Sequence, residues 1–72
     1  MHEFNRDSFA ANLRAARAFC SISQDELAQM TGISRDAIYT YENGITTPGA
    51  DKVHALCVAL KTTPNKLLGW KA

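Results

Sequence analysis

Apolar positions along the chain recur at helical spacings within short segments. Phe9, Leu13, Ala16 and Cys20 follow one another at intervals of four, three and four residues, which places them on one stripe of a helix over residues 7–19. A second stripe, in a helix that ends near residue 60, comprises Val53, Leu56, Cys57 and Leu60. No segment shows a run of alternating β-branched residues, so the pattern predicts no β-strand.

The second and third helices have start and stop signals of their own. Ser23 and Glu26 form a capping box, in which the serine hydroxyl and the glutamate carboxylate each accept a free amide N–H at the start of a helix. This helix ends at Gly32. Its predicted inward-facing residues are Leu27, Ala28 and Met30. Ser34 caps the third helix, which ends at residues 43–44.

Two Thr-Pro pairs predict the starts of the last two helices. A threonine can cap a helix, and a proline fits the first turn, where its missing N–H has no partner to lose. Thr47-Pro48 therefore begins the fourth helix, and Thr63-Pro64 begins a short fifth helix that ends at Gly69. Five short helices with short connections predict a compact all-α fold, and a length of 72 residues indicates that residues 1–72 form a single domain.

The connection between the second and third helices consists of only three residues, 32–34. Such a short connection makes two helices cross at a steep angle, which is the helix-turn-helix arrangement, here over residues 24–43. Ala28 is small where the next helix crosses, and Ile33 and Ile38 fill the space between the two helices. The residue types and their spacing therefore favour a helix-turn-helix unit.

The third helix has an apolar face and a polar face. On a helical wheel, Ala37, Ile38 and Tyr41 point to one side. The opposite face carries the hydrogen-bonding residues Arg35, Asp36, Tyr39, Thr40 and Asn43. Arginine can bridge guanine O6 and N7, aspartate can accept from cytosine N4, and threonine can contact a base edge or a thymine methyl group. Tyrosine can pack on a sugar or reach a phosphate. The face therefore suits DNA, although a plain solvated helix face is the alternative that this pattern leaves open.

The string SQDELAQMTGISRDAIYTYENG resembles the helix-turn-helix domain of the phage repressor and Cro proteins, the xenobiotic-response-element family. The matching features are the Ser-Gln opening, Leu27-Ala28, Gly32, Ile38 and Tyr41-Glu42-x-Gly44. The similarity covers about residues 9–69 and includes Leu13-Arg14-x-x-Arg17, Pro48 and Leu67-Leu68-Gly69. It implies a repressor-like five-helix fold and binding to double-stranded DNA.

The resemblance also implies roles for individual residues, with the recognition helix 35–43 in the major groove. The base-reading positions are Arg35, Asp36 and Thr40, with Tyr39 beside them. The phosphate-contacting positions are Gln24 and Asn43, together with Thr46, Thr47 and the backbone around residues 45–47. Arg17 and Glu42 match a partly buried ion pair that ties the first helix to the end of the third, and losing one partner of such a pair is costly.

Three features depart from the family pattern. Lys61 stands where the family has a helix-ending glycine, and a left-handed backbone there costs about 1 kcal/mol for a lysine. The loop 44–47 contains no lysine or arginine, which weakens its expected grip on phosphate. Asp36 repels phosphate unless it meets a cytosine or pairs with Arg35, so an Arg35–Asp36 partnership that only orients the arginine is an alternative to direct reading.

Composition and the absence of other motifs argue against several other functions. The net charge of +1 is too small for a histone-like protein that binds DNA by charge alone. Cys20 and Cys57 occupy apolar helical positions and are expected to be reduced core thiols, with a disulfide between them as the alternative. His2 and His54 lie far from each other and from any Cys-x-x-Cys motif, so no metal site is expected. Because no nucleophile–base grouping, paired carboxylates or phosphate loop stands out, we expect neither an enzyme nor a cofactor.

We therefore expect a transcription regulator, a repressor that binds an operator as a homodimer, because one domain presents too few base-reading side chains to select a genomic site. Val58 and Trp70 are the candidate dimer surface, and RNA polymerase is a further candidate partner. The alternatives are an antitoxin whose main partner is a toxin protein, and the N-terminal piece of a longer repressor. With no signal-like segment or long apolar run, we expect no membrane association and a cytoplasmic, bacterial or phage-encoded protein.

Overall fold

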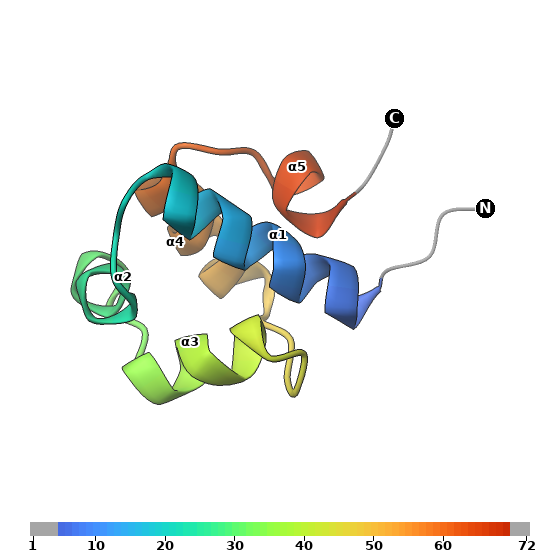
Figure 1. Cartoon of the computed structure of the whole chain (residues 1–72), viewed down its shortest axis with the longest axis horizontal. Coiled ribbons are helices and arrows are strands. Elements are labelled where there is room, and N and C mark those ends of the chain that lie inside the picture. Colours follow the sequence, from blue (N-terminus) through green and yellow to red (C-terminus); the bar gives the residue numbers. More distant parts are fainter. Residues whose placement is uncertain (1–4, 70–72) are drawn as a thin grey trace.

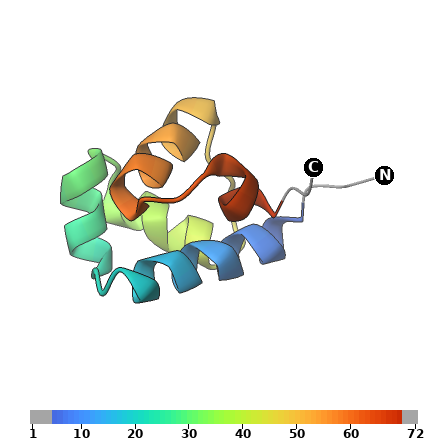
Figure 2. The same ribbon diagram turned by 90° about the horizontal axis from the view of Figure 1, so that it is seen from above.

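The computed structural model describes residues 5–69, and this part of the chain forms five α-helices without a β-strand. The helices are α1 (Arg6–Phe19), α2 (Gln24–Thr31), α3 (Arg35–Glu42), α4 (Ala50–Leu60) and α5 (Pro64–Leu68). In Figure 1, α1 crosses the middle of the molecule and packs against α3 on one side and α5 on the other. Figure 2 shows α5 lying between α1 and α4, while α2 packs against α3 and α4. The predicted all-α, five-helix fold is confirmed.

The core combines apolar side chains from all five helices. The largest fully buried side chains are Phe9, Leu13, Leu27, Ile38, Leu56 and Leu67. The assignment of Met30 to the inward arc of α2 was wrong, because its side chain is 56% exposed. On the wheel of α2, Thr31 lies about 40° from Leu27 on the side of Ala28, whereas Met30 lies about 60° away on the other side. The inward arc is therefore centred between Leu27 and Ala28, and Met30 falls outside it.

The two cysteines are free thiols. Cys57 is buried and Cys20 is half-buried. The Cys20 thiol donates to the Leu60 carbonyl oxygen at 3.4 Å. Burial raises the pKa of the Cys57 thiol, which keeps it protonated and unreactive. Within residues 5–69, no helix has the length and apolar character that crossing a lipid bilayer requires.

Two helix ends place a residue other than glycine in the left-handed backbone region. Lys61, at φ 55°, adopts the strained conformation that the sequence predicted. Ser21 adopts a similar conformation after α1, at φ 57°, although it gives no glycine or asparagine signal. At both ends the following N–H donates to a carbonyl five residues back, from Ile22 to Arg17 and from Thr62 to Cys57. These bonds satisfy carbonyl groups that the helix leaves unpaired.

The predicted start of the fourth helix was wrong by two residues. α4 begins at Ala50, and its cap is Gly49, which makes no side-chain cap hydrogen bond. Residue 49 has an extended backbone, and Thr47 and Pro48 belong to the connection 43–49 between α3 and α4. Asp51 places a negative charge near the free amides of the first turn. The second Thr-Pro signal was correct, because the Thr63 hydroxyl accepts from the Lys66 N–H at the start of α5.

Candidate nucleic-acid interface

α3 lies at an edge of the molecule, with one face in the core and the other in solvent (Figure 1). Ile38 is fully buried and Tyr41 is 8% exposed. On the outer face, Arg35, Asp36, Tyr39 and Asn43 are exposed and Thr40 is half-buried. The helix ends at Glu42, one residue before the predicted end, and Asn43 is its C-cap. The two-faced character predicted from the helical wheel is therefore present in the fold.

The turn between α2 and α3 is closed by local hydrogen bonds. Gly32 has a φ of 74°, and a Cβ at this position would meet no atom within 4 Å, so the backbone angle rather than space favours glycine. The Thr31 hydroxyl donates to the Leu27 carbonyl oxygen at 2.8 Å and accepts from the Ile33 N–H at 3.2 Å. Ser34 caps α3 by accepting from an amide three residues later. These bonds set the direction in which α3 leaves the turn.

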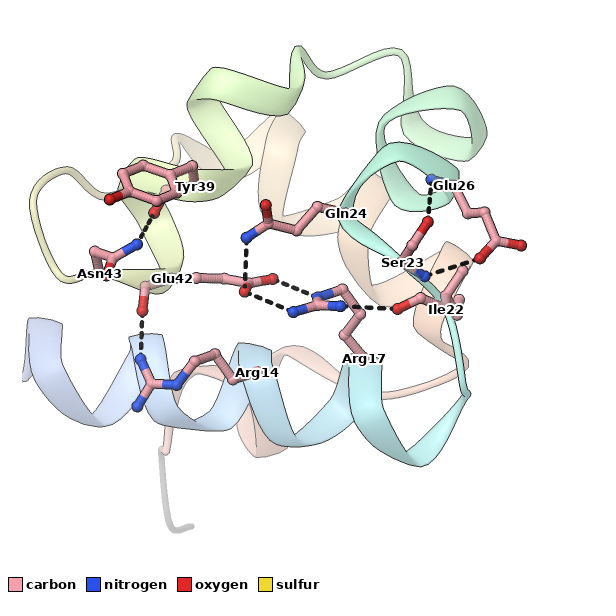
Figure 3. A network of polar contacts seen from close by, with 9 residues as sticks. All are labelled: Arg14, Arg17, Ile22, Ser23, Gln24, Glu26, Tyr39, Glu42 and Asn43. Atoms are coloured by element: carbon pink, nitrogen blue, oxygen red, sulfur yellow. Dashed lines mark hydrogen bonds and ion pairs between the residues drawn. The ribbon is translucent and has the colours of Figure 1, made fainter.

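The buried carboxylate of Glu42, at the end of α3, bonds to side chains of α1 and α2 and so helps to position the outer face of α3 (Figure 3). Glu42 is only 2% exposed, and its two carboxylate oxygens accept from Arg17 Nε at 2.7 Å and Nη2 at 3.0 Å. Gln24 Nε2 donates to the same carboxylate at 3.1 Å. Arg14 donates to the Glu42 carbonyl oxygen, and Arg17 Nη1 donates to the Ile22 carbonyl oxygen at 2.9 Å. The hydrogen bond to Glu42 also raises the pKa of Arg17. This junction therefore ties the end of α3 to both α1 and α2.

The start of α2 is well defined by the predicted capping box. Ser23 Oγ accepts from the Glu26 N–H at 3.0 Å, and Glu26 Oε1 accepts from the Ser23 N–H at 2.9 Å. The hydrogen bond from the Ser23 backbone, followed by that from its hydroxyl, lowers the pKa of the Glu26 carboxyl. The resulting stabilisation is complete above the unfolded-state pKa of Glu26 and is lost as the pH falls through its lower folded-state pKa.

Gln24, the first residue of α2, has one amide N–H committed to Glu42. A side-chain amide has two such donors, so the second N–H is left for a ligand. The bond to the buried carboxylate holds the half-buried Gln24 side chain in one orientation. The position assigned to phosphate contact therefore carries an amide that is already oriented.

Arg35 forms an ion pair with α2 instead of with its neighbour in the chain. Its Nε lies 3.4 Å from Asp25 Oδ1, and the two side chains are 63% and 67% exposed. In the structure, the carboxylate that pairs with Arg35 belongs to Asp25, and the partnership of Arg35 with Asp36 stays a prediction. Solvent screens such an exposed pair, so it holds Arg35 weakly.

Several polar groups at the end of α3 are bonded within the protein. Thr40 Oγ1 donates to the Ala37 carbonyl oxygen at 2.8 Å and lies 2.8 Å from Thr46 Oγ1. Because Thr40 has one hydroxyl proton, Thr46 is the donor of the second bond. Asn43 Nδ2 donates to the Tyr39 carbonyl oxygen at 2.7 Å. Thr40, Asn43 and Thr46 thus have fewer free donors for DNA than their sequence positions suggest.

The backbone of the following loop is also turned inward. The N–H groups of Ile45 and Thr46 both donate to the Thr40 carbonyl oxygen, at 2.9 and 3.4 Å. These two amides are therefore occupied in the structure, which removes them from the backbone donors expected to meet phosphate at residues 45–47. The side chain of Thr47 is exposed.

Comparison with known families matches residues 8–68 to the helix-turn-helix domain. This chain belongs to the helix-turn-helix family. Among solved structures, it is similar to the P22 c2 repressor in complex with a synthetic operator, with 33% identity over 88% of this chain and 96% of that chain and a TM-score of 0.82. The predicted resemblance to phage repressor and Cro-like domains is confirmed.

Two further structures extend the comparison. The restriction-modification controller protein C.AhdI from Aeromonas hydrophila is 27% identical over 86% of this chain and 94% of that chain, with a TM-score of 0.82. The clp gene regulator ClgR from Corynebacterium glutamicum is 25% identical over 90% of this chain and 69% of that chain, with a TM-score of 0.83. A comparison with curated protein sequences gave no match.

Val58 and Arg6 lie outside the outer face of α3. Val58 is 66% exposed and lines a shallow hollow of about 570 Å³ between α2 and α4, together with Met30. Trp70, the other residue assigned to a dimer surface, lies outside the described residues. Arg6, which carries no motif in the sequence, donates through Nη1 to the Ile45 carbonyl oxygen at 3.0 Å. No spacing in the sequence indicates this contact, because 39 residues separate its partners.

Proposed function

We propose that this protein is a sequence-specific double-stranded DNA-binding transcription regulator that places α3 in the major groove. The observation that carries the proposal is the outer face of α3, a row of hydrogen-bonding side chains on a helix whose other face is locked into the core. The Glu42 junction supports it, because rigid presentation lowers the ordering cost of contacting base edges. Membership in the helix-turn-helix family supports the same reading.

In this proposal, Arg35 and Tyr39 are the main side chains that reach DNA bases or their surroundings. Both are exposed, and the Arg35 guanidinium can exchange its weak pairing with Asp25 for a bidentate bond to guanine. Asp36 accepts from a cytosine amino group. Thr40 presents its methyl group, since its hydroxyl is bonded within the protein. Gln24 donates its second amide N–H to a phosphate at the start of α2.

We further propose that the protein acts as a repressor and binds its operator as a two-fold dimer. A single α3 covers only a few base pairs, whereas two copies can read half-sites about one helical turn apart. The P22 c2 repressor, with which the chain shares 33% identity, was solved on an operator. Val58 belongs to the proposed dimer surface, because it is a large exposed apolar side chain beside an apolar hollow.

Selection of binding sites from random duplex DNA, at about 0.15 M salt, tests the proposal. The expected result is a palindromic consensus whose half-sites lie about ten base pairs apart. Enrichment of a single half-site would support base reading and contradict the dimer. No enrichment by protein that circular dichroism shows to be folded would overturn the proposal in favour of a protein partner such as a toxin.

A further inference from the structure

The loop that follows α3 lacks a cation of its own. Residues 43–48 read NGITTP, and the structure commits the Ile45 and Thr46 amides to the Thr40 carbonyl oxygen. An eight-residue helix is about 12 Å long, which is close to the width of the major groove. If α3 lies in the groove as proposed, the loop after its C-terminal end therefore comes next to a phosphate-lined wall. Carbonyl oxygens and uncharged hydroxyls alone hold phosphate poorly.

Arg6 brings a positive charge to this loop from the start of α1, 39 residues away in the chain. It is the first residue of α1, and one of its five N–H donors is used on the Ile45 carbonyl oxygen, at 3.0 Å. The side chain is exposed. The ion pairs among residues 5–69 are Arg17–Glu42 and Arg35–Asp25, so within this part of the chain the Arg6 charge has no carboxylate partner. The bond to Ile45 holds the guanidinium at the loop and, among residues 5–69, leaves its other donors for a ligand.

We propose that Arg6 is a phosphate-binding residue, which supplies to the α3–α4 loop the cation that the loop sequence lacks. The ligand is a phosphodiester group of duplex DNA, contacted at the C-terminal end of α3. This inference rests on the proposed function, because it assumes that α3 enters the groove. It assigns to the first turn of α1 a direct role in affinity and no role in reading bases, since phosphate contacts position a protein without specifying sequence.

A neighbouring carboxylate opposes this contact and provides a second probe. A Cβ on Gly44 would lie 2.8 Å from Asp7 Oδ1, so the Asp7 carboxylate sits directly against the loop. Its negative charge repels a phosphate at the same place. Asp7→Asn should therefore strengthen DNA binding uniformly across sequences, in the opposite direction to the loss of Arg6.

The test compares duplex binding by the wild type, Arg6→Gln, Arg6→Lys and Lys66→Gln over a range of salt concentrations. Lys66→Gln is the matched control, because it removes the same charge from an exposed position on α5, on the opposite side of α1 from α3 (Figure 1). Each protein is titrated with the selected operator and with a duplex of unrelated sequence. Thermal melting confirms that the variants remain folded, and Arg6→Lys keeps the charge without the planar fork.

Arg6→Gln should reduce the slope of log affinity against log salt by about 0.9 and weaken binding about fivefold at 0.15 M salt, on both duplexes. Arg6→Lys should keep the wild-type slope, and Lys66→Gln should leave slope and affinity unchanged. A wild-type slope in Arg6→Gln, or a loss on the operator alone, would overturn the role of Arg6. A wild type that binds both duplexes equally would defeat the proposed sequence reading, while the slopes would still decide the role of Arg6. Absence of any duplex binding would overturn both proposals.

Discussion

Two arginine–carboxylate pairs in this domain use the same chemical groups in opposite surroundings. Arg17 and Glu42 lie 2.7 Å apart, with side chains 23% and 2% exposed. Arg35 and Asp25 lie 3.4 Å apart, with side chains 63% and 67% exposed. The first pair is enclosed by α1, α2 and α3, whereas the second bridges the outer surfaces of α2 and α3.

The difference in burial decides what each pair does. Away from water, an ion pair is strongly attractive, but each charge has lost its hydration, so both partners must stay together. In water the same attraction is screened and contributes at most about 1 kcal/mol. The buried pair can therefore hold the helices in register, while the exposed pair leaves Arg35 free to exchange partners. An arginine is available to a ligand only where breaking its ion pair within the protein costs little free energy.

The largest expected effect comes from breaking the buried pair. Arg17→Met leaves the Glu42 carboxylate buried without its ionic partner and should lower the free energy of unfolding by about 3 kcal/mol. Urea denaturation at pH 7 measures this loss. The double variant Arg17→Met/Glu42→Met removes the stranded charge as well and should recover part of the stability. A cost below about 0.5 kcal/mol for Arg17→Met, the size expected of an exposed pair, would contradict the comparison.

Arg35→Ala should act on DNA recognition instead of stability. Loss of a bidentate contact to one base should reduce discrimination at that base pair by about 1–3 kcal/mol. Binding to operator variants substituted at each position measures the effect, and the free energy of unfolding should change by less than about 0.5 kcal/mol. An unchanged base preference would show that Arg35 does not read a base.

Gln24 donates to the buried Glu42 carboxylate and is also proposed to contact a phosphate, and Gln24→Ala tests the second role. Binding should weaken by about 1 kcal/mol, similarly for operator and unrelated duplexes, because a phosphate contact carries no sequence information. Gln29→Ala is the matched control at an exposed position on the same helix. A loss confined to the operator would instead assign Gln24 to base reading.

The smallest effect is expected from breaking the exposed pair. Asp25→Asn should change the free energy of unfolding by less than about 0.5 kcal/mol, in contrast to Arg17→Met. Affinity for DNA should rise slightly, because Arg35 loses a competing carboxylate and the surface of α2 beside Arg35 loses a negative charge that repels DNA. Denaturation and duplex titration measure the two quantities. A stability loss near that of Arg17→Met would show that exposure does not separate the pairs.

Local signals predicted most of the helical framework. The capping box at Ser23, the left-handed Gly32 and the cap at Thr63 involve residues close in the chain, so their chemistry acts whatever the rest of the fold does. The helix start predicted at Thr47-Pro48 was wrong because the chain needs these two residues to connect α3 to α4. The prediction that Met30 faces inward was wrong because a helical wheel shows which residues of an eight-residue helix share a face, but not which other helices that face contacts.

The sequence by itself determined the five helices, the tight turn between α2 and α3, and the two-faced character of α3, because spacing and capping are local. Only the tertiary structure decided which polar groups remain available. It placed Asp25 beside Arg35, Glu42 beside Gln24, and Arg6 beside the Ile45 carbonyl. These partners come from helices or loops brought together by packing of the core, and no spacing along the chain encodes the distance between them.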